Sequence, residues 1–263
     1  MAIAAVGGAN NNSAVNVHTL TVTYTPTNGN WLVLGMSTGA TITGLTVKDN
    51  NNVVLTTGPT INNARLFYYQ VTGSPTSFTA TWTNDVQVSM AVEEYSGAVG
   101  VDANTSRTTF TAQGSGTSES LTISILQPNN FIVVLLADTS NTQTGTVGNV
   151  RQQTTASSAR IALMDNTSGS AGNVTCTATT GASSGWSAVG LELGGAGQVI
   201  VNQDVRLTAL QRDSQFAHIE QDVLLVITPW SNLPLNRVAQ EVLLVVTPFT
   251  PITRRISQLW VIT

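Results

Sequence analysis

The stretch FTATWTNDVQVSMAVEEY, residues 78–95, decides the fold class of this chain. Apolar and polar residues alternate in Phe78–Trp82 and again in Val86–Tyr95, with a polar turn between them. Such alternation is typical of β-strands with one face in a core. The sequence therefore predicts two strands here. The same pattern recurs in His18–Tyr24, Trp31–Met36, Leu66–Val71, Phe131–Leu136, Arg160–Met164, Val174–Ala178 and Trp186–Leu193.

The spacing of these segments favours one class of all-β fold. Polar turns separate them at intervals of roughly 8–15 residues, and none has a helical period, which together favour a sandwich or jelly roll. We predict an all-β chain with a jelly-roll-like β-sandwich over residues 1–193. Gln113–Ser120 is strongly polar, so we expect an exposed, flexible loop there.

Composition excludes several function classes. The 263-residue chain is 41% hydrophobic but only 9% charged, with a net charge of −4 and Lys48 as its single lysine. We expect no nucleic-acid partner without a basic stripe, and no membrane span without 18 consecutive apolar residues. The single cysteine, Cys176, cannot form an intrachain disulfide. The N-terminus has no basic segment followed by a long apolar run, so we expect no signal peptide.

Glycines then interrupt the strand pattern at Gly194-Gly195-Ala196-Gly197. Such a stretch has no side chains to pack and is typical of a domain boundary. We predict a linker over residues 194–198 and a separate domain over residues 199–263.

The predicted second domain consists of a fourfold sequence repeat. Its glutamines are 18, 19 and 18 residues apart, at Gln203, Gln221, Gln240 and Gln258. A basic residue comes shortly before three of them, at His218, Arg237 and Arg255. Two repeats continue into near-identical apolar runs that end in Thr-Pro and an aromatic residue, Trp230 or Phe249.

Each repeat places one amide on an otherwise apolar strand face. A buried amide without a partner costs about 1–3 kcal/mol. The glutamines either stack as a ladder that fixes register or bond to local backbone at a bend, and the sequence leaves both open. The sequence also does not decide whether the repeats form an antiparallel meander or a prism-like stem. Late in each repeat both faces are apolar, which predicts cover by another chain, a symmetry mate or the first domain. We expect an assembly interface containing the four glutamines with Arg237, Arg255, Trp230, Phe249 and Trp260.

No catalytic or metal-binding motif is recognisable, so we predict neither an enzyme nor a cofactor. The two histidines, His18 and His218, lie in strand patterns of different domains. Glu93 and Glu94 are adjacent on a strand, so they point to opposite faces and do not form an acid–base pair. A calcium site formed by Asp102 with one of these glutamates is a weaker interpretation than a strand end with solvated acids. Asp49, followed by three asparagines, is better read as a hairpin turn than a calcium loop.

Aromatic residues suggest a second functional hypothesis, in which exposed rings form a platform that binds sugars by stacking. The candidates are Trp31, Trp82, Tyr68, Tyr69 and Tyr95. With only 6% aromatic residues in the chain, we expect most of them to be needed in the core.

Two segments resemble known families. Met90–Asp102, which contains EYSG and DA, is similar to a strand-and-turn of a widespread jelly-roll or sandwich module, and Trp186–Leu193 is similar to a strand near that module's end. The module occurs in bacterial secreted proteins and in virion proteins of tailed bacteriophages. Arg237–Val242 and Arg255–Gln258 resemble R-V-x-Q-x-V repeats of tailed-phage structural proteins, although the first repeat has Ile200 in place of the basic residue.

The resemblance implies a non-enzymatic structural component of a phage virion, assembled in the host cytoplasm. It would be a head decoration or cement protein, a head or tail fibre, or an adaptor. Its partners would be itself, as a homotrimer joined by the C-terminal repeats, and other virion proteins. The alternative is a carbohydrate-binding or adhesion module, with host surface glycans as its partner.

Overall fold

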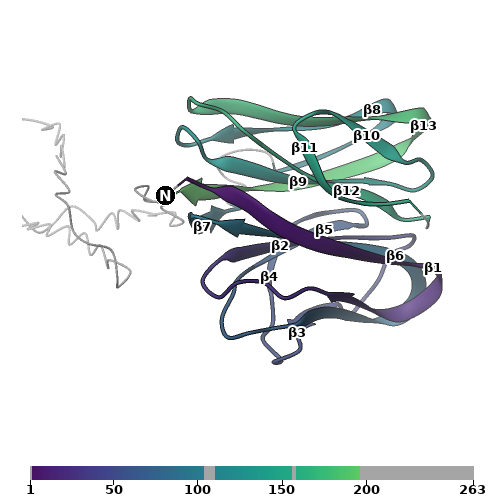
Figure 1. Ribbon diagram of the computed structural model, residues 1–263. Coiled ribbons are helices and arrows are strands. Elements are labelled where there is room, and N and C mark those ends of the chain that lie inside the picture. Colours follow the sequence, from purple (N-terminus) through teal and green to yellow (C-terminus); the bar gives the residue numbers. More distant parts are fainter. Residues whose placement is uncertain (1, 104–109, 156–157, 196–263) are drawn as a thin grey trace, which may run out of the picture. The chain divides into compact units, whose positions relative to one another are not determined.

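The chain folds into two antiparallel sheets, as the sequence predicts (Figure 1). The computed structural model describes residues 2–103, 110–155 and 158–195, and these residues form strands but no helix. Each sheet is built from consecutive strands, the first from residues 2–96 (half 1) and the second from residues 98–195 (half 2). The all-β sandwich is therefore confirmed, whereas the jelly-roll detail is not.

The sheet of half 1 has six strands in the order β1-β6-β2-β5-β4, with β3 paired to β6. Its strands are β1 (Ala4–Thr23), β2 (Trp31–Thr38), β3 (Thr46–Asp49), β4 (Thr56–Ile61), β5 (Ala64–Gln70) and β6 (Ser77–Ser96).

The sheet of half 2 has seven strands in the order β10-β13-β9-β12-β11, with β7 and β8 also paired to β13. Its strands are β7 (Ala98–Asp102), β8 (Thr111–Ile125), β9 (Phe131–Asp138), β10 (Gln143–Val147), β11 (Asn149–Thr154), β12 (Arg160–Thr167) and β13 (Gly172–Gly195).

Strand β6 explains why each sheet folds over on itself. Its start pairs with β3 and its end, Val88–Tyr95, pairs with β2, so one long strand replaces the two that the sequence predicts. The neighbouring strand β1 follows it with register shifts between Ser13 and Thr19. Every residue of Val88–Tyr95 is buried, because one face covers the core of half 1 and the other packs against half 2. Strand β13 takes the same course in half 2.

Three apolar cores result from this folding. One lies inside half 1 around Leu34 and Phe78, and one inside half 2 around Leu136 and Ile123. The third lies between the two sheets and joins side chains of both halves, among them Tyr95. The two halves therefore form one packed body over residues 2–195.

The two halves also repeat one topology. In half 1, β1 pairs with β6, β6 with β2, β2 with β5, and β5 with the edge strand β4. In half 2, β8 pairs with β13, β13 with β9, β9 with β12, and β12 with the edge strand β11. Strands β1, β2, β3, β4, β5 and β6 correspond in this way to β8, β9, β10, β11, β12 and β13. Packing between the halves obeys the same correspondence, since β11 lies against β1 and β6 just as β4 lies against β8 and β13.

The correspondence extends to single hydrogen bonds. The amide of Asn30, just before β2, donates to buried Glu94, and the amide of Asn130, just before β9, donates to buried Glu192. Each carboxylate also accepts a backbone N–H from the turn before that strand. Likewise, the hydroxyls of Thr21 and Thr79 lie 2.8 Å apart, and those of Thr122 and Thr175 lie 2.7 Å apart. Half 2 is thus a structural repeat of half 1.

Two predictions about the chain's course are changed. The expected loop Gln113–Ser120 is wrong, because these residues lie in β8 and most pair with β13. Their polar side chains fit an edge strand with one face toward solvent. Strand β13 continues to Gly195, so the first two residues of the predicted linker lie in the sheet. The remaining linker and the predicted repeat domain, residues 196–263, lie outside the described residues.

Candidate functional site

An open pocket of about 760 Å³ lies at one end of the seam between the halves. Ser37, Ala64, Ala137 and Ser187 line it, and such small side chains leave the ends of the two sheets incompletely filled. Ser37 and Ala137 are corresponding residues of β2 and β9, so the pocket draws on both halves. Asn62 donates hydrogen bonds to Gln113 at 2.7 Å and to Ser187 at 3.0 Å, which link the halves at its rim.

The pocket lies at the end of the seam away from the chain's described termini. Strand β13 pairs with β9 along the seam. The pairing begins at Trp186 and Asp138, which line the pocket, and ends at Leu193 and Phe131. Seven residues of strand separate these ends by about 23 Å. The N-terminus and Gly195 lie at the far end, where β1 and β7 begin (Figure 1).

Behind the pocket wall lies a group of polar side chains from four strands, which we name the polar end cluster: Glu119 (β8), Asp138 (β9), Gln143 (β10) and Ser184 (β13). Glu119 pairs with Ala178 and Gln143 pairs with Thr180, so both flank β13 on the face that lines the core. Asp138, Glu119 and Gln143 are at most 1% exposed.

Hydrogen bonding differs sharply within this cluster. Asp138 accepts hydrogen bonds from the backbone amides of Ser140 and Asn141, at 2.6 and 2.7 Å, and from the hydroxyl of Ser184. Glu119 lies next to Asp138 and Gln143, but among the described residues no hydrogen bond of ordinary geometry reaches either carboxylate oxygen of Glu119 or the amide nitrogen and oxygen of Gln143. Unpaired buried groups of this kind are uncommon, and each costs roughly 1–3 kcal/mol.

The two carboxyl groups titrate in opposite directions. Burial and, to a smaller extent, the neighbouring Asp138 together raise the pKa of Glu119 to about 8. Burial also opposes ionisation of Asp138, but the hydrogen bonds that it accepts outweigh this effect and lower its pKa. Without a cation, Glu119 is therefore protonated at neutral pH beside an ionised Asp138. Since Glu119 has no exposed surface, this pair is not placed to act on a ligand in the pocket.

Half 1 has no such cluster at the corresponding end. Trp82 occupies the position of Ala178 and fills the space with its indole ring, and Ile42 occupies the position of Gln143. Thr38 corresponds to Asp138. The end of the core is thus largely apolar in half 1, apart from the buried indole nitrogen of Trp82, and polar in half 2.

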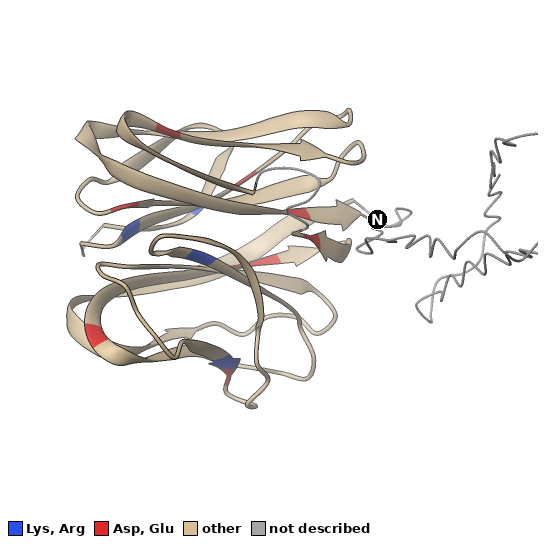
Figure 2. Ribbon diagram, turned by 180° about the vertical axis from the view of Figure 1, so that it is seen from behind, with Lys and Arg blue, Asp and Glu red and all other residues tan. Residues whose placement is uncertain are grey.

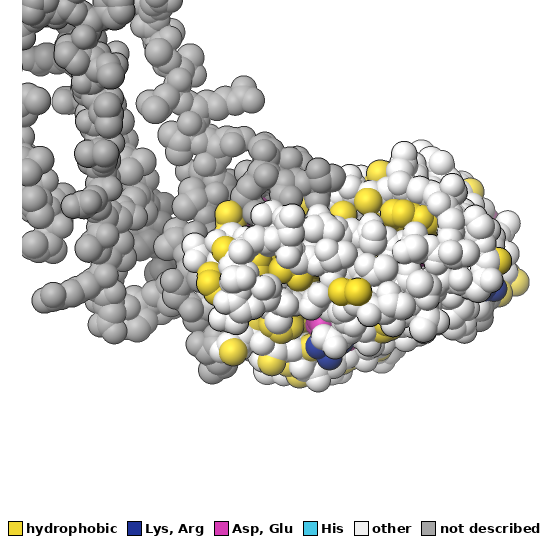
Figure 3. Space-filling view, turned by 90° about the horizontal axis from the view of Figure 1, so that it is seen from above, with side chains coloured by type: hydrophobic (Ala, Val, Ile, Leu, Met, Phe, Trp, Pro, Cys, Tyr) yellow, Lys and Arg dark blue, Asp and Glu magenta, His cyan; other side chains and the backbone are white. Residues whose placement is uncertain are grey.

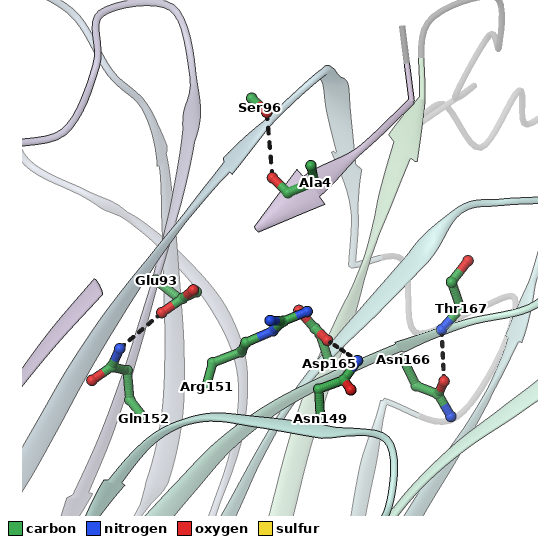
Figure 4. A network of polar contacts seen from close by, with 9 residues as sticks. All are labelled: Ala4, Glu93, Ser96, Asn149, Arg151, Gln152, Asp165, Asn166 and Thr167. Atoms are coloured by element: carbon green, nitrogen blue, oxygen red, sulfur yellow. Dashed lines mark hydrogen bonds and ion pairs between the residues drawn. The ribbon is translucent and has the colours of Figure 1, made fainter. Parts of the chain in front are cut away.

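A second polar network crosses the seam near the edge formed by β1, β6 and β11 (Figure 4). Gln152 donates to Glu93 at 3.0 Å, and Arg151 donates to Asp165 at 2.6 Å. The hydrogen bond to Asp165 raises the pKa of Arg151, whereas burial raises the pKa of Glu93. A Cβ atom at Gly8 would lie 2.3 Å from the Glu93 carboxylate, so only glycine fits there. This network joins the two halves through the contact between Gln152 and Glu93.

The acidic residues considered in the sequence have structural partners. Glu93 and Glu94 point to opposite faces, as predicted, toward β11 and toward the turn before β2. Asp49 accepts backbone N–H groups of Asn51 and Val53 at 2.9 and 2.8 Å, which is the predicted hairpin turn. Asp102 lies buried in β7 opposite Glu192. In the described ranges, no group of three or more His, Cys, Asp or Glu side chains is arranged to hold a metal.

The remaining candidates divide between core, surface and undescribed residues. Trp82, Tyr69 and Tyr95 are buried in cores, as expected, and Trp31 and Tyr68 are half-buried against each other with ring centroids 6.4 Å apart. His18 is exposed, 3.1 Å from Asp85. The predicted assembly residues lie outside the described residues: Gln203, Gln221, Gln240, Gln258, Arg237, Arg255, Trp230, Phe249, Trp260 and the basic-slot His218.

No family model, curated protein or solved structure matches this chain. The described residues also contain no helix long and apolar enough to cross a membrane.

Sequence reasoning missed the polar end cluster and the repeat in residues 2–195. Glu119 lay in the expected loop, and Asp138 and Gln143 lie in different strands whose pairing no local pattern reveals. A signal for the repeat was present, since LTVT at 20–23 matches LTIS at 121–124.

Proposed function

We propose that the chain is a non-enzymatic structural component of a tailed-phage virion, as a head decoration or cement protein, a fibre or an adaptor. The observation that carries the proposal is the sequence repeat around Arg237–Val242 and Arg255–Gln258, with its resemblance to tailed-phage structural proteins. In this function residues 199–263 join the chain to copies of itself, as a homotrimer, or to other virion proteins. Residues 2–195 form the body that they carry.

The described body suits such a role. Its two halves share a continuous core, which favours a rigid unit. Charged residues are sparse on its strands (Figure 2), and one face consists largely of uncharged polar side chains and backbone with scattered apolar groups (Figure 3). Gly195, the last described residue before the repeats, lies at one end of the seam and the pocket lies at the other.

The proposal is tested on particles released by cells that carry the gene. Particles are purified on a density gradient, washed in high salt and probed with antibodies against residues 2–195, with a host cytoplasmic protein as the contamination control. The chain is expected in the particle fraction at a fixed ratio to the major coat protein. Recovery of the chain only in the soluble fraction would overturn the proposal.

The second candidate is a carbohydrate-binding module, which the pocket favours. Its lining offers neutral amides and hydroxyls, such as Asn62, Gln113 and Ser187, and no Lys or Arg. Such groups suit an uncharged, hydroxyl-rich ligand more than a phosphate or an acidic sugar. Binding to an array of neutral glycans should be lost in Gln113→Ala and kept in Thr122→Val, which lies outside the pocket. An array without signal, or equal signals from both variants, would reject this candidate.

A further inference from the structure

The polar end cluster is costly to bury, although Asp138 fastens the turn after β9 through the backbone amides of Ser140 and Asn141. The side chains of Glu119 and Gln143 have no hydrogen bond of ordinary geometry in the described part of the chain. Half 1 closes the same end of an equivalent core with Trp82 and Ile42, which shows that the topology does not require polar groups there. At this end half 1 buries the unpartnered indole nitrogen of Trp82, whereas half 2 buries both carboxylate oxygens of Glu119 and both amide atoms of Gln143 without ordinary partners. This larger cost in half 2 points to a missing ligand.

We propose that Glu119, Asp138, Gln143 and Ser184 form a binding site for one hard divalent cation, of which Ca²⁺ fits best. The proposal goes beyond the virion assignment and does not depend on it. It rests on four side chains that converge from four strands, one of which, Gln143, is an unpartnered amide only 1% exposed.

The available donors match the coordination chemistry of calcium. Ca²⁺ takes six to eight oxygen ligands in flexible geometry. Glu119 offers both carboxylate oxygens, Gln143 its amide oxygen and Ser184 its hydroxyl. Asp138 offers Oδ2, because its Oδ1 is held by the amides of Ser140 and Asn141. These five oxygens leave room for water, whereas Mg²⁺ demands a stricter octahedron and releases its water reluctantly.

Charge balance supports the same occupant. Two buried carboxylates side by side cannot both ionise without a counter-charge, and no Lys or Arg is among the groups that act on either one. A divalent cation would neutralise both. Ala178 is smaller than Trp82, its counterpart in half 1, and Asp138 lines the pocket, which gives an ion a route from solvent.

The experiment uses the full chain, treated with EDTA and then titrated with Tb³⁺, Ca²⁺ or Mg²⁺. Tb³⁺ occupies calcium sites and emits when a nearby indole is excited. Trp186 is suitably placed, since it is the cross-strand neighbour of Asp138. We expect sensitised emission that Ca²⁺ reverses, and a rise in Tm of roughly 5–10 °C at a hundredfold excess of Ca²⁺ over its Kd. Mg²⁺ should give a much smaller shift.

Variants distinguish loss of cation binding from loss of the Tb³⁺ emission and from failure to fold. Glu119→Gln and Asp138→Asn should lose both responses, whereas Asp85→Asn, an exposed acid, should keep both. Trp186→Phe should lose most of the emission but keep the Ca²⁺-dependent Tm shift. Gln143→Ile copies half 1, so it should raise the Tm of the metal-free protein and weaken the Ca²⁺ response, which keeps the test valid if a charge variant fails to fold. No Tm shift with Ca²⁺, or an equal shift in Gln143→Ile, would overturn the proposal in favour of a protonated pair or a buried water.

Discussion

Half 1 and half 2 share a topology but close their cores differently. Each folds a sheet over on itself with a long bent strand, and each fastens the turn before its second strand with a buried glutamate, Glu94 or Glu192. At the end near the pocket, Trp82 and Ile42 complete an apolar core in half 1, while half 2 has the polar end cluster. The two halves share their strand topology, and the polar end cluster that only half 2 contains is the candidate site.

A second difference lies where corresponding residues meet at the seam. A Cβ atom at Gly35 would lie 2.6 Å from Cδ1 of Leu135, its counterpart in half 2. A small residue in one half and a large residue in the other therefore fill this space. A symmetric dimer of two identical chains would have to place the same residue on both sides. The covalent link between the halves permits this asymmetry, because each position mutates independently.

The largest expected effect comes from reversing that pair. Leu135→Gly should destabilise the body by about 3–5 kcal/mol through the cavity that it leaves, and Gly35→Leu by about 1–3 kcal/mol through overpacking. The double variant should lose clearly less than the sum of the two, since it restores one small and one large residue. Urea unfolding of residues 2–195 measures all three. Strict additivity would contradict the pseudo-symmetric seam.

The turn-fastening asparagines should give the next largest effect. Asn30→Ala removes one donor from buried Glu94, and Asn130→Ala removes one from buried Glu192, each at about 1–3 kcal/mol. Asn130 also accepts the backbone N–H of Gly195 at 3.3 Å, so its loss should cost more. The free energy of unfolding in urea, with Asn16→Ala as an exposed control, tests this order. A negligible cost in either half would show that the two turns are not equivalent.

A smaller effect concerns pH and the seam network. Burial raises the pKa of Glu93 above its ordinary value of 4.5, while its counterpart in half 2 is Leu191. The folded state then holds this proton to higher pH than the unfolded state, so Glu93 should lower the free energy of unfolding as pH rises from about 4.5. Glu93→Gln should remove that part of the slope in Tm measured from pH 4 to 7. Identical slopes in the variant and the parent would refute this assignment.

The smallest effect should come from the paired threonines. Thr21→Val and Thr122→Val each remove one hydroxyl–hydroxyl contact between neighbouring strands at the surface, at roughly 0.2–1 kcal/mol. We expect the two costs to agree within the error of urea unfolding. A much larger loss in one half would show that the contact has a different role there.

The sequence predicts the strands well where one face is buried. Alternation locates the segments around Trp31–Met36 and Phe131–Leu136 because it reports which face meets a core. It fails at β8, where an edge strand with solvent on one face looks like a loop. It also splits β6, because the polar residues 83–85 interrupt the pattern while the strand continues around the bend.

The candidate site is harder to predict than the strands. Glu119, Asp138 and Gln143 meet only because β8 and β10 both pair with β13 beside β9. The significance of Ala178 appears only when it is compared with Trp82 at the corresponding position of half 1. Local patterns identify faces, whereas a site built from four strands requires the pairing order.

The most direct test of the central claim, that residues 2–195 form a self-contained body and the C-terminal repeats assemble it, is molar mass by light scattering after size exclusion. We predict a discrete trimer for the full chain and a folded monomer for residues 1–195. A monomeric full chain, or a truncated chain that stays trimeric, would contradict the account.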